Sequence, residues 1–315
     1  MDALIYPYKL GKRAGALIEL IDAGGKRGVG EIAPLPGWSL ETLDEALAAL
    51  KNGEMTYPSL KFALETAYLG LNLPQLPISL PYCPLLMGSR EKILRDARHV
   101  VGGVVKVKIS DFSDEEAEGL LQELKETFSL RVDLNRKWSL ARALKFFSKF
   151  VPEDFDFIEE PCAKVEDLKH FPFPIGADES LRDTPLEELS KIPHLKALVL
   201  KPTLQGGLRV AHKLASFAQE KNLDLVFSAA FESGVGIAQI ALLAYKLNGP
   251  VKSLGLDTYR YLEDDVLKKP LDFSEGCLHL REPLFQLKEE LSAVPFTIPQ
   301  SVFQQLAHLD QTPFI

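Results

Sequence analysis

The sequence predicts an α/β protein in which a small α+β unit caps a parallel (β/α)7β barrel. Beyond about residue 100, short apolar runs rich in β-branched residues alternate with longer amphipathic runs, as in repeated strand–helix units. The strand candidates are apolar almost throughout, which indicates a parallel sheet covered on both faces. Seven or eight repeats about 25 residues apart favour a closed TIM-type barrel over an open doubly wound sheet.

The first part of the chain has a different, mixed pattern, with turn residues between two apolar runs and two amphipathic segments after them. The expected strands are Ala14–Ile21 and Gly28–Ala33, and the expected helices are Leu40–Lys51, with Ser39 as N-cap, and Ser59–Leu71.

The expected barrel strands are Val104–Ile109, Leu130–Asn135, Phe155–Glu159, Ile175–Asp178, Ala197–Lys201, Leu223–Ser228 and Leu254–Asp257, with Leu278–Leu280 as a candidate for one more. The expected helices are Asp114–Phe128, Leu140–Phe150, Pro185–Ile192, Leu208–Asn222 and Ile237–Leu247. We therefore expect a capping domain at residues 1–95, completed by the C-terminal tail at 285–315, and a catalytic barrel domain at 96–284.

Composition narrows the function classes. The 315 residues are 46% hydrophobic and 25% charged, and the net charge is −8. This charge argues against binding to nucleic acid or to an anionic membrane, because both depend on excess Lys and Arg. Three widely spaced cysteines form neither a disulfide framework nor a zinc motif and are typical of a reducing cytosol. With no signal-peptide pattern at the N-terminus, we expect a cytoplasmic protein.

Charged residues lie at the carboxyl ends of five successive strand candidates. They occur in the order Lys108, Asp133, Glu159, Asp178 and Lys201. The carboxyl ends of barrel strands lie on one face, where barrel enzymes place their chemistry. Single charges at such positions often cap the next helix or pair with a lysine, but five in succession indicate a site.

Three acids on neighbouring strands, about 4.8 Å apart, would repel one another unless a cation neutralised them. Oxygen ligands alone favour Mg²⁺, or Mn²⁺, over Zn²⁺. A lysine beside the metal and a second lysine is expected to have a lowered pKa and to act as a base. Lys106 and Lys108 lie on the same strand face, so either is a candidate base. Arg131 is a candidate anion contact.

These motifs resemble those of the enolase superfamily. The superfamily pattern of Lys-x-Lys, Asp-x-Asn, Glu-Glu-Pro, Asp-Glu-Ser and a lone Lys is matched by Lys106-Val107-Lys108, Asp133-Leu134-Asn135, Glu159-Glu160-Pro161, Asp178-Glu179-Ser180 and Lys201. The resemblance implies that Asp133, Glu159 and Asp178 are the metal ligands. It also implies that Lys108 is the acid/base residue and Lys201 its partner across the site. Glu160 and Glu179 point the other way along their strands, because neighbouring strand residues alternate between faces, so we expect them to have a supporting or structural role.

Within the superfamily, the chain is similar to the o-succinylbenzoate synthases of menaquinone biosynthesis. The segment Gly28–Ser39 looks like their mobile capping loop, Gly255-Leu256-Asp257-Thr258 looks like their last barrel strand, and Ser228 falls at a substrate-contacting serine. Together with Arg131, the residues expected to bind substrate are then Lys106, Asn135, Ser228 and Gly255. Phe231-Glu232 departs from the expected pattern and leaves the shape of that pocket wall open.

The resemblance implies a lyase that removes water from 2-succinyl-6-hydroxy-2,4-cyclohexadiene-1-carboxylate, a small carboxylate substrate. Two alternatives stay open from the sequence. N-acylamino-acid racemases and other muconate-lactonizing-type members share the same array of residues, and an inactive metal-binding barrel would keep the acids. Retention of both Lys108 and Lys201 argues against the inactive barrel. The oligomeric state is left open.

Overall fold

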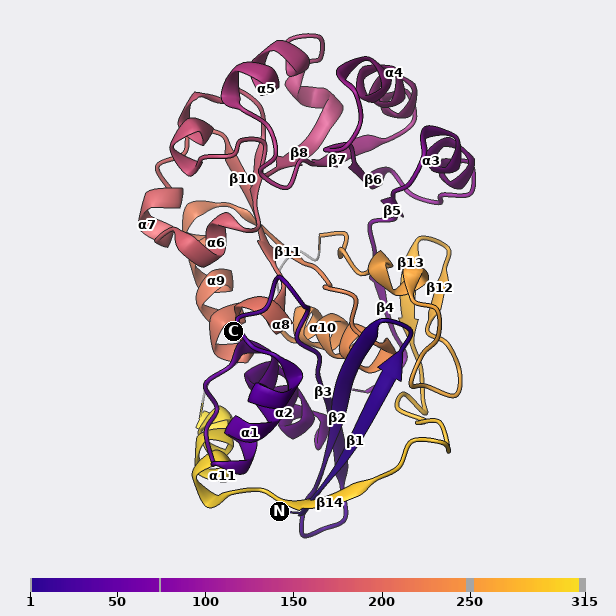
Figure 1. The fold of residues 1–315 in the computed structure, drawn as a ribbon, viewed down its shortest axis with the longest axis vertical. Coiled ribbons are helices and arrows are strands. Elements are labelled where there is room, and N and C mark those ends of the chain that lie inside the picture. Colours follow the sequence, from indigo (N-terminus) through magenta and orange to yellow (C-terminus); the bar gives the residue numbers. More distant parts are fainter. Residues whose placement is uncertain (1, 74, 248–251, 312–315) are drawn as a thin grey trace.

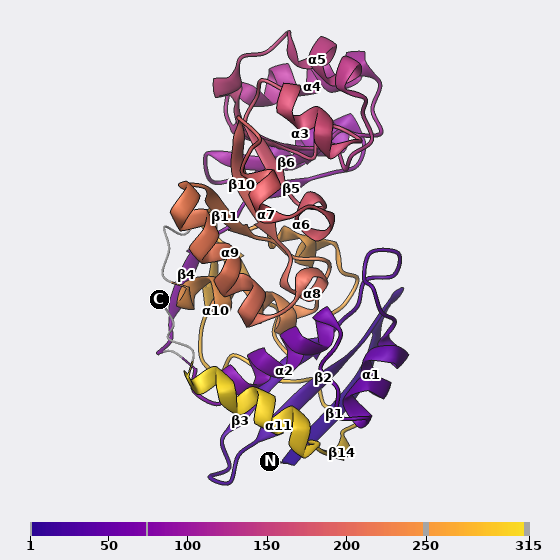
Figure 2. The ribbon, with the colours of Figure 1, turned by 90° about the vertical axis from the view of Figure 1, so that its left-hand side faces the viewer.

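The computed structural model describes residues 2–73, 75–247 and 252–311. Figure 1 shows the barrel strands and their helices at one end of the molecule and an antiparallel sheet with its helices at the other, and Figure 2 shows the same arrangement from the side. Among the described residues, no helix combines the length and the apolar character needed to cross a membrane.

The N-terminal unit is a four-stranded antiparallel sheet in the order β14-β1-β2-β3, covered by two helices. Its elements are β1 (Asp2–Leu10), β2 (Arg13–Ile21), β3 (Arg27–Ile32), α1 (Leu43–Lys51), α2 (Pro58–Gly70) and β14 (Val294–Thr297). The pairing of β14 with β1 attaches the C-terminal segment to this sheet, and α11 (Gln300–Ala307) contacts α2. The last residues of the expected tail, 312–315, lie outside the described part, and the domain boundary at residue 95 stays a prediction.

The first helix begins later than the sequence predicts. Thr42, not Ser39, is its N-cap: the Thr42 hydroxyl accepts a hydrogen bond from the Glu45 amide, and the Glu45 carboxylate accepts one from the Thr42 amide. The Ser39 hydroxyl instead accepts a hydrogen bond from the Leu35 amide, which folds the preceding loop back on itself.

Glycines let β3 approach α2 closely. A Cβ at Gly30 would stand 1.9 Å from the carbonyl oxygen of Ala63, and one at Gly28 would stand 2.0 Å from that of Ala67. Any side chain at these positions would force the strand and helix apart. The two glycines therefore serve packing, which accounts for a Gly-x-Gly pattern that superficially suggests a phosphate loop.

The barrel is confirmed as a (β/α)7β barrel. Its parallel sheet has the order β11-β10-β9-β8-β7-β6-β5. The strands are β5 (Leu85–Leu86), β6 (Val104–Lys108), β7 (Ser129–Asp133), β8 (Phe155–Glu159), β9 (Ile175–Ala177), β10 (Leu195–Leu200) and β11 (Asp224–Phe227). Parallel bridges from Leu254 to Tyr82 and from Gly255 to Ser228 close the ring through a very short eighth strand.

Helices surround these strands. They are α3 (Arg90–Ala97), α4 (Asp114–Lys125), α5 (Leu140–Phe147), α6 (Ser180–Asp183), α7 (Leu186–Leu189), α8 (Pro202–Gln205), α9 (Leu208–Lys221) and α10 (Gly234–Lys246). Short 3₁₀ turns lie at Pro152–Asp154, Val165–His170, Asp257–Tyr261 and His308–Gln311.

Two strand predictions are corrected. Leu278–Leu280 is not a barrel strand: it belongs to β13 (Cys277–Leu280), which pairs antiparallel with β4 (Ile78–Pro81) and β12 (Asp272–Ser274). The first barrel strand, β5, is missing from the prediction because its two residues follow Pro84, so the run is too short to show a period.

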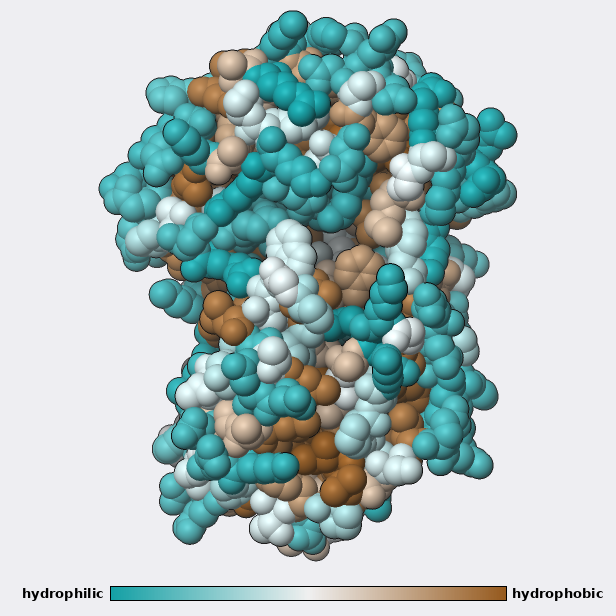
Figure 3. Space-filling model, in the orientation of Figure 1, coloured by the Kyte–Doolittle hydropathy of each residue, from teal (hydrophilic) through white to brown (hydrophobic). Residues whose placement is uncertain are grey.

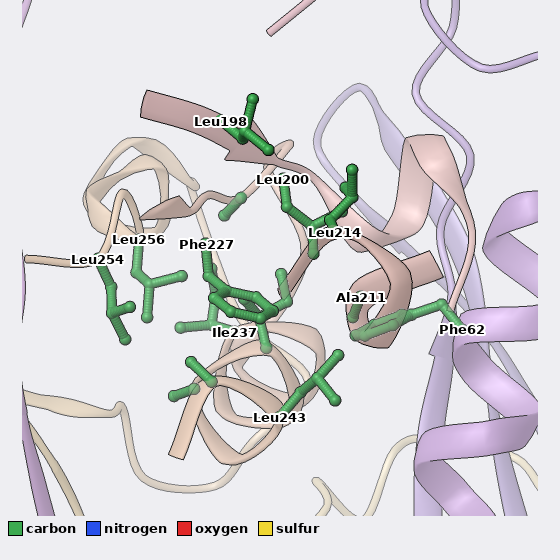
Figure 4. Close-up of a cluster of buried hydrophobic side chains, with 14 of the residues drawn as sticks. Phe62, Leu198, Leu200, Ala211, Leu214, Phe227, Ile237, Leu243, Leu254 and Leu256 are labelled. Atoms are coloured by element: carbon green, nitrogen blue, oxygen red, sulfur yellow. The ribbon is translucent and has the colours of Figure 1, made fainter. Parts of the chain in front are cut away.

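One continuous hydrophobic core joins the two units. In Figure 4, Phe227 of β11 packs on Ile237 of α10 within the barrel, and the ring of Phe62 from α2 reaches Ala211 of α9. Figure 3 shows hydrophilic residues over most of the barrel end of this face, whereas hydrophobic residues gather over the region of α2 and the β1–β3 sheet. Because the core is shared, the N-terminal unit packs directly against the barrel.

Candidate active site

The structure brings the charged strand ends together at the carboxyl end of the barrel. In the parallel register, Lys108 pairs with Asp133 of β7, and Asp133 pairs with Glu159 of β8. Glu159 pairs with the residue of β9 that lies two positions before Asp178. Lys201 directly follows β10, the next strand.

The three acids are buried, and lysines neutralise them. Asp133, Glu159 and Asp178 are 0%, 1% and 2% exposed. The Lys106 ammonium nitrogen lies 2.8 Å from both carboxylate oxygens of Glu159 and 2.9 Å from Asp133 Oδ2. The Lys201 ammonium group is paired with the Asp178 carboxylate. Each buried negative charge therefore has a cation in contact.

The carboxylates dominate the electrostatics of this cluster. Burial acts to lower the pKa of Lys106 and of Lys201, but the surrounding carboxylates outweigh burial and raise both pKa values above the ordinary range. Burial and the charge of Asp133 raise the pKa of Glu159 to about 7, and burial raises that of Asp178. Burial also acts to raise the pKa of Asp133, but the nearby ammonium groups overcome it and hold that pKa well below its usual range.

Lys108 has a freer position than Lys106. Its ammonium nitrogen lies 3.3 Å from Asp133 Oδ2 and 3.5 Å from Asn135 Oδ1, at the outer limit of a hydrogen bond. Its side chain is 37% exposed, against 13% for Lys106. Of the two lysines of the Lys-x-Lys pair, Lys108 is thus the one whose amine is open to a bound molecule.

Asp133, Glu159 and Asp178 are suited to hold a divalent cation, because they are buried and offer oxygen ligands. All their ligand atoms are carboxylate oxygens, which suits Mg²⁺ or Mn²⁺. Asp133 Oδ2 is buried and has no partner at hydrogen-bond geometry in the part of the chain that the structure describes, although the ammonium groups of Lys106 and Lys108 lie at ion-pair distance. Within residues 2–73, 75–247 and 252–311, however, no three acidic, His or Cys side chains already stand at metal-binding spacing. The ammonium group of Lys106 bridges two of the acids instead.

A cavity of about 190 Å³ opens over this cluster. Six of the residues predicted from the sequence line it: Lys106, Lys108, Asn135, Lys201, Ser228 and Gly255. Leu35 and Trp38 of the capping segment line the cavity from the N-terminal unit, and Ala230 and Phe231 line it from the barrel. The wall near Phe231, which the sequence left open, is therefore an aromatic wall.

Ser228 and Gly255 form one corner of the cavity. The Ser228 hydroxyl donates a hydrogen bond to the Gly255 carbonyl at 3.2 Å, next to the bridge that closes the barrel. A Cβ at Gly255 would stand 2.6 Å from Ser228 Oγ, so only glycine leaves this hydroxyl in place.

The prediction that Arg131 contacts substrate is corrected by its position. Its guanidinium donates to the Asp156 carboxylate at 2.8 Å and to the Ser253 carbonyl at 2.6 Å, and it lies over the Phe157 ring. Asp156 belongs to the first part of β8, and Ser253 precedes the last strand. The side chain therefore turns to the amino end of the barrel, away from the cavity, and is 3% exposed.

Asp257 is a cavity residue that the sequence reasoning did not single out. It accepts a hydrogen bond from the Leu85 amide at 2.8 Å and pairs with Arg260 at 2.8 Å. Burial raises its pKa to about 6. The rule that finds the other acids, a charge at the carboxyl end of a strand, would also have found this one.

Glu160 supports the backbone of the site and points away from the three acids, as expected. It has a positive φ of 45° and accepts hydrogen bonds from the amides of Asp178 and Ser180 and from the Arg136 guanidinium. These contacts turn its side chain away from the carboxylate cluster and fix the backbone that carries Asp178. Glu179 has one contact in the site, a 3.3 Å hydrogen bond from Asn135 Nδ2.

Known proteins match this chain along most of its length. Residues 92–283 match the family described as "Enolase C-terminal domain-like", and residues 3–71 match "MenC, N-terminal domain". Curated o-succinylbenzoate synthases of Yersinia pseudotuberculosis (serotype O:1b) and Yersinia pestis (strain Pestoides F) are each 32% identical over 284 residues, which cover 82% of this chain and 87% of the relative.

Solved structures share the fold. A dipeptide epimerase from Enterococcus faecalis aligns with a TM-score of 0.77 at 19% identity, over 89% of this chain and 96% of its own. Muconate lactonizing enzyme from Pseudomonas putida aligns with a TM-score of 0.74 at 19% identity, over 98% of both chains. The family matches and the 32% identity over most of the chain lead to one conclusion: the chain belongs to the o-succinylbenzoate synthase family of the enolase superfamily.

Proposed function

We propose that this chain converts 2-succinyl-6-hydroxy-2,4-cyclohexadiene-1-carboxylate into 2-succinylbenzoate by syn-dehydration, a step of menaquinone biosynthesis. The observation that carries the proposal is that Lys108 and Lys201 line one cavity, each touching a different buried carboxylate of the acidic cluster. Family membership supports the choice of substrate.

The proposed cofactor is Mg²⁺, with Mn²⁺ as the alternative, held by Asp133, Glu159 and Asp178. Support comes from the all-oxygen donor set, the burial of the three acids and the Asp133 oxygen for which the described residues supply no hydrogen-bond donor at good geometry. When bound, the cation supplies positive charge that stabilises the negative charge developing on the substrate carboxylate.

Lys108 is the proposed acid and base. Its amine is open to the cavity, whereas the amine of Lys106 is held by the carboxylates of Glu159 and Asp133. Lys108 Nζ removes the proton from the carbon that bears the carboxylate. The bond from the ring to the hydroxyl group then breaks, and the same proton leaves with the hydroxide as water. The ring becomes aromatic, which drives the reaction forward.

Lys201 is proposed to stabilise the enediolate through its fixed positive charge, since the neighbouring carboxylates keep its pKa high. Lys106, Asn135, Ser228 and Gly255 are proposed to position the substrate, because all four line the cavity. The proposed partner is thus a small carboxylate.

The test is a continuous absorbance assay of the dehydration with the purified full-length chain, with Mg²⁺ and after chelation. Turnover that needs added metal and is lost in Lys108→Ala and Lys201→Ala supports the proposal. Racemisation of N-acylamino acids without any dehydration would assign the chain to the alternative activity. Metal binding without either reaction would identify an inactive barrel.

A further inference from the structure

One buried arginine, Arg13, makes hydrogen bonds to both walls of the cavity. Arg13 opens β2 of the N-terminal sheet and is 8% exposed. Its guanidinium donates to the carbonyls of Pro34 at 2.5 Å and Ala33 at 2.7 Å, which lie at the start of the capping segment. It also donates to the carbonyls of Phe231 at 3.1 Å and Ala230 at 3.3 Å, which belong to the turn after β11.

Both bonded segments line the cavity. The lining residue Leu35 follows Pro34 directly and Trp38 lies three residues further on, whereas Ala230 and Phe231 are themselves lining residues. The first segment belongs to the capping unit and the second to the barrel. The Arg13 side chain therefore ties the backbone of one wall directly to the backbone of the other.

The turn that Arg13 holds is strained. Phe231 has a φ of 62°, a left-handed conformation that bulky side chains rarely adopt. Neighbouring carboxylates hold the amides of the same turn: Glu232 accepts from the Ala230 amide at 2.5 Å, and Glu31 accepts from the Ser233 amide at 3.0 Å. Arg13 bonds the carbonyls while these acids bond the amides, so the backbone is fixed from both sides.

We propose that Arg13 is a positioning residue that holds the capping segment Ala33–Trp38 against the Ala230–Phe231 turn and thereby sets the shape of the substrate cavity. The inference rests on the proposed function insofar as it concerns catalysis. Its structural part does not, because the position of Trp38 can be measured without substrate.

Only an arginine suits this role. The guanidinium is planar and offers five N–H donors in a fixed fork, enough to reach four carbonyls on two segments. A lysine has three donors on one nitrogen and no fork. Arg13→Lys therefore keeps the charge but is expected to restore little of the positioning.

The first experiment follows Trp38 by fluorescence. The chain has two tryptophans, so Trp138→Phe leaves Trp38 as the only emitter, and phenylalanine keeps an aromatic ring at the fully buried position that packs against Phe146. In this background, Arg13→Met is expected to red-shift the emission and to increase quenching by acrylamide, because the carbonyls of Ala33 and Pro34 lose their link through Arg13 to the Ala230–Phe231 turn.

The second experiment separates positioning from general destabilisation. Arg13→Met is expected to raise KM about tenfold while kcat changes by less than about threefold, because the substrate must then order the wall when it binds. The matched control is Glu65→Ala, which removes another buried contact between the two units, the hydrogen bond from the Leu208 amide. Glu65 does not line the cavity, so this variant is expected to lose stability without a change in Trp38 quenching or KM.

The outcomes are distinguishable. Unchanged Trp38 quenching in a folded Arg13→Met chain would overturn the inference, even if the dehydration assay succeeds. Equal effects of Arg13→Met and Glu65→Ala on Trp38 would also overturn it, because they would indicate a general loosening. If Arg13→Met does not fold, Arg13→Lys takes its place: wild-type quenching and KM in that variant would contradict the proposed role. A chain without dehydratase activity but with the expected Trp38 response would refute the proposed function alone.

Discussion

The ammonium nitrogen of Lys106 lies 2.8 Å from both carboxylate oxygens of Glu159. Without a metal ion, Lys106 is the cation that neutralises the centre of the acidic cluster. Lys106→Met would leave buried charges unpaired, which costs about 3–5 kcal/mol. We expect urea unfolding of the metal-free variant to show a loss of this order, and Mg²⁺ to recover more stability in the variant than in the wild type. An equal response of both chains to Mg²⁺ would contradict this.

Lys108 is expected to matter for turnover rather than for stability. Lys108→Ala is predicted to lower kcat by about 10²–10⁴-fold, the usual contribution of a positioned acid or base. Because its ammonium makes only marginal contacts, at 3.3 and 3.5 Å, the metal-free chain should unfold at nearly the wild-type urea concentration. Near-wild-type turnover with Mg²⁺ bound would exclude the assigned role.

The raised pKa of the buried Asp257 leads us to expect a specific pH dependence of the free energy of unfolding. Burial raises its pKa from 3.8 to about 6, so the folded chain prefers the neutral carboxyl group. Below about pH 4, Asp257 is protonated in the folded and the unfolded chain, and the free energy of unfolding is at its full value. As the pH rises through about 6, the carboxyl group must ionise in its buried position, and this stability is lost. Asp257→Asn, which cannot ionise, should therefore gain about 3 kcal/mol relative to the wild type between pH 4 and pH 7. Urea unfolding of both chains measures this, and a constant difference across the range would refute it.

Gly255 predicts a local steric effect. In Gly255→Ala the new methyl group meets Ser228 Oγ at 2.6 Å, so the hydroxyl must move and KM is expected to rise. Gly119→Ala is the matched control, because Gly119 is exposed within α4 and has open space around it. That change should stabilise the chain by about 0.5–1 kcal/mol without altering KM. Equal kinetics of the two variants would argue against the Ser228 corner as a substrate contact.

The cysteines predict a simple labelling pattern. Burial raises the pKa of Cys83 to about 11 and that of Cys162 to about 12, so both thiols stay protonated at pH 8. Cys277 is partly exposed. Iodoacetamide should therefore label one thiol quickly in the folded chain and all three in urea, and Cys277→Ser should abolish the fast reaction. Fast labelling of Cys83 would show that the cavity wall opens.

Strand positions were predictable where an apolar run of ordinary length ends in a charge, as at Lys108, Asp133 and Glu159. The short strand β5 was not predictable, because a run of two residues shows no periodicity. The start of α1 at Leu43 was not predictable either, because Ser39 and Thr42 are both residue types that commonly cap a helix N-terminus. Asp257 was missed as a cavity residue although the same strand-end pattern contains it.

The amino-acid sequence by itself determined the class of fold, the order of the charged strand ends and the family, since these depend on local periodicity and on residue types at short spacings. Only the tertiary structure decided which charges meet. It turned Arg131 to the amino end of the barrel, placed Lys106 between two acids while leaving Lys108 open to the cavity, and brought Arg13 to a turn more than two hundred residues away. These relations depend on side-chain direction and on contacts between distant segments, and chain folding sets both through packing rather than through local pattern.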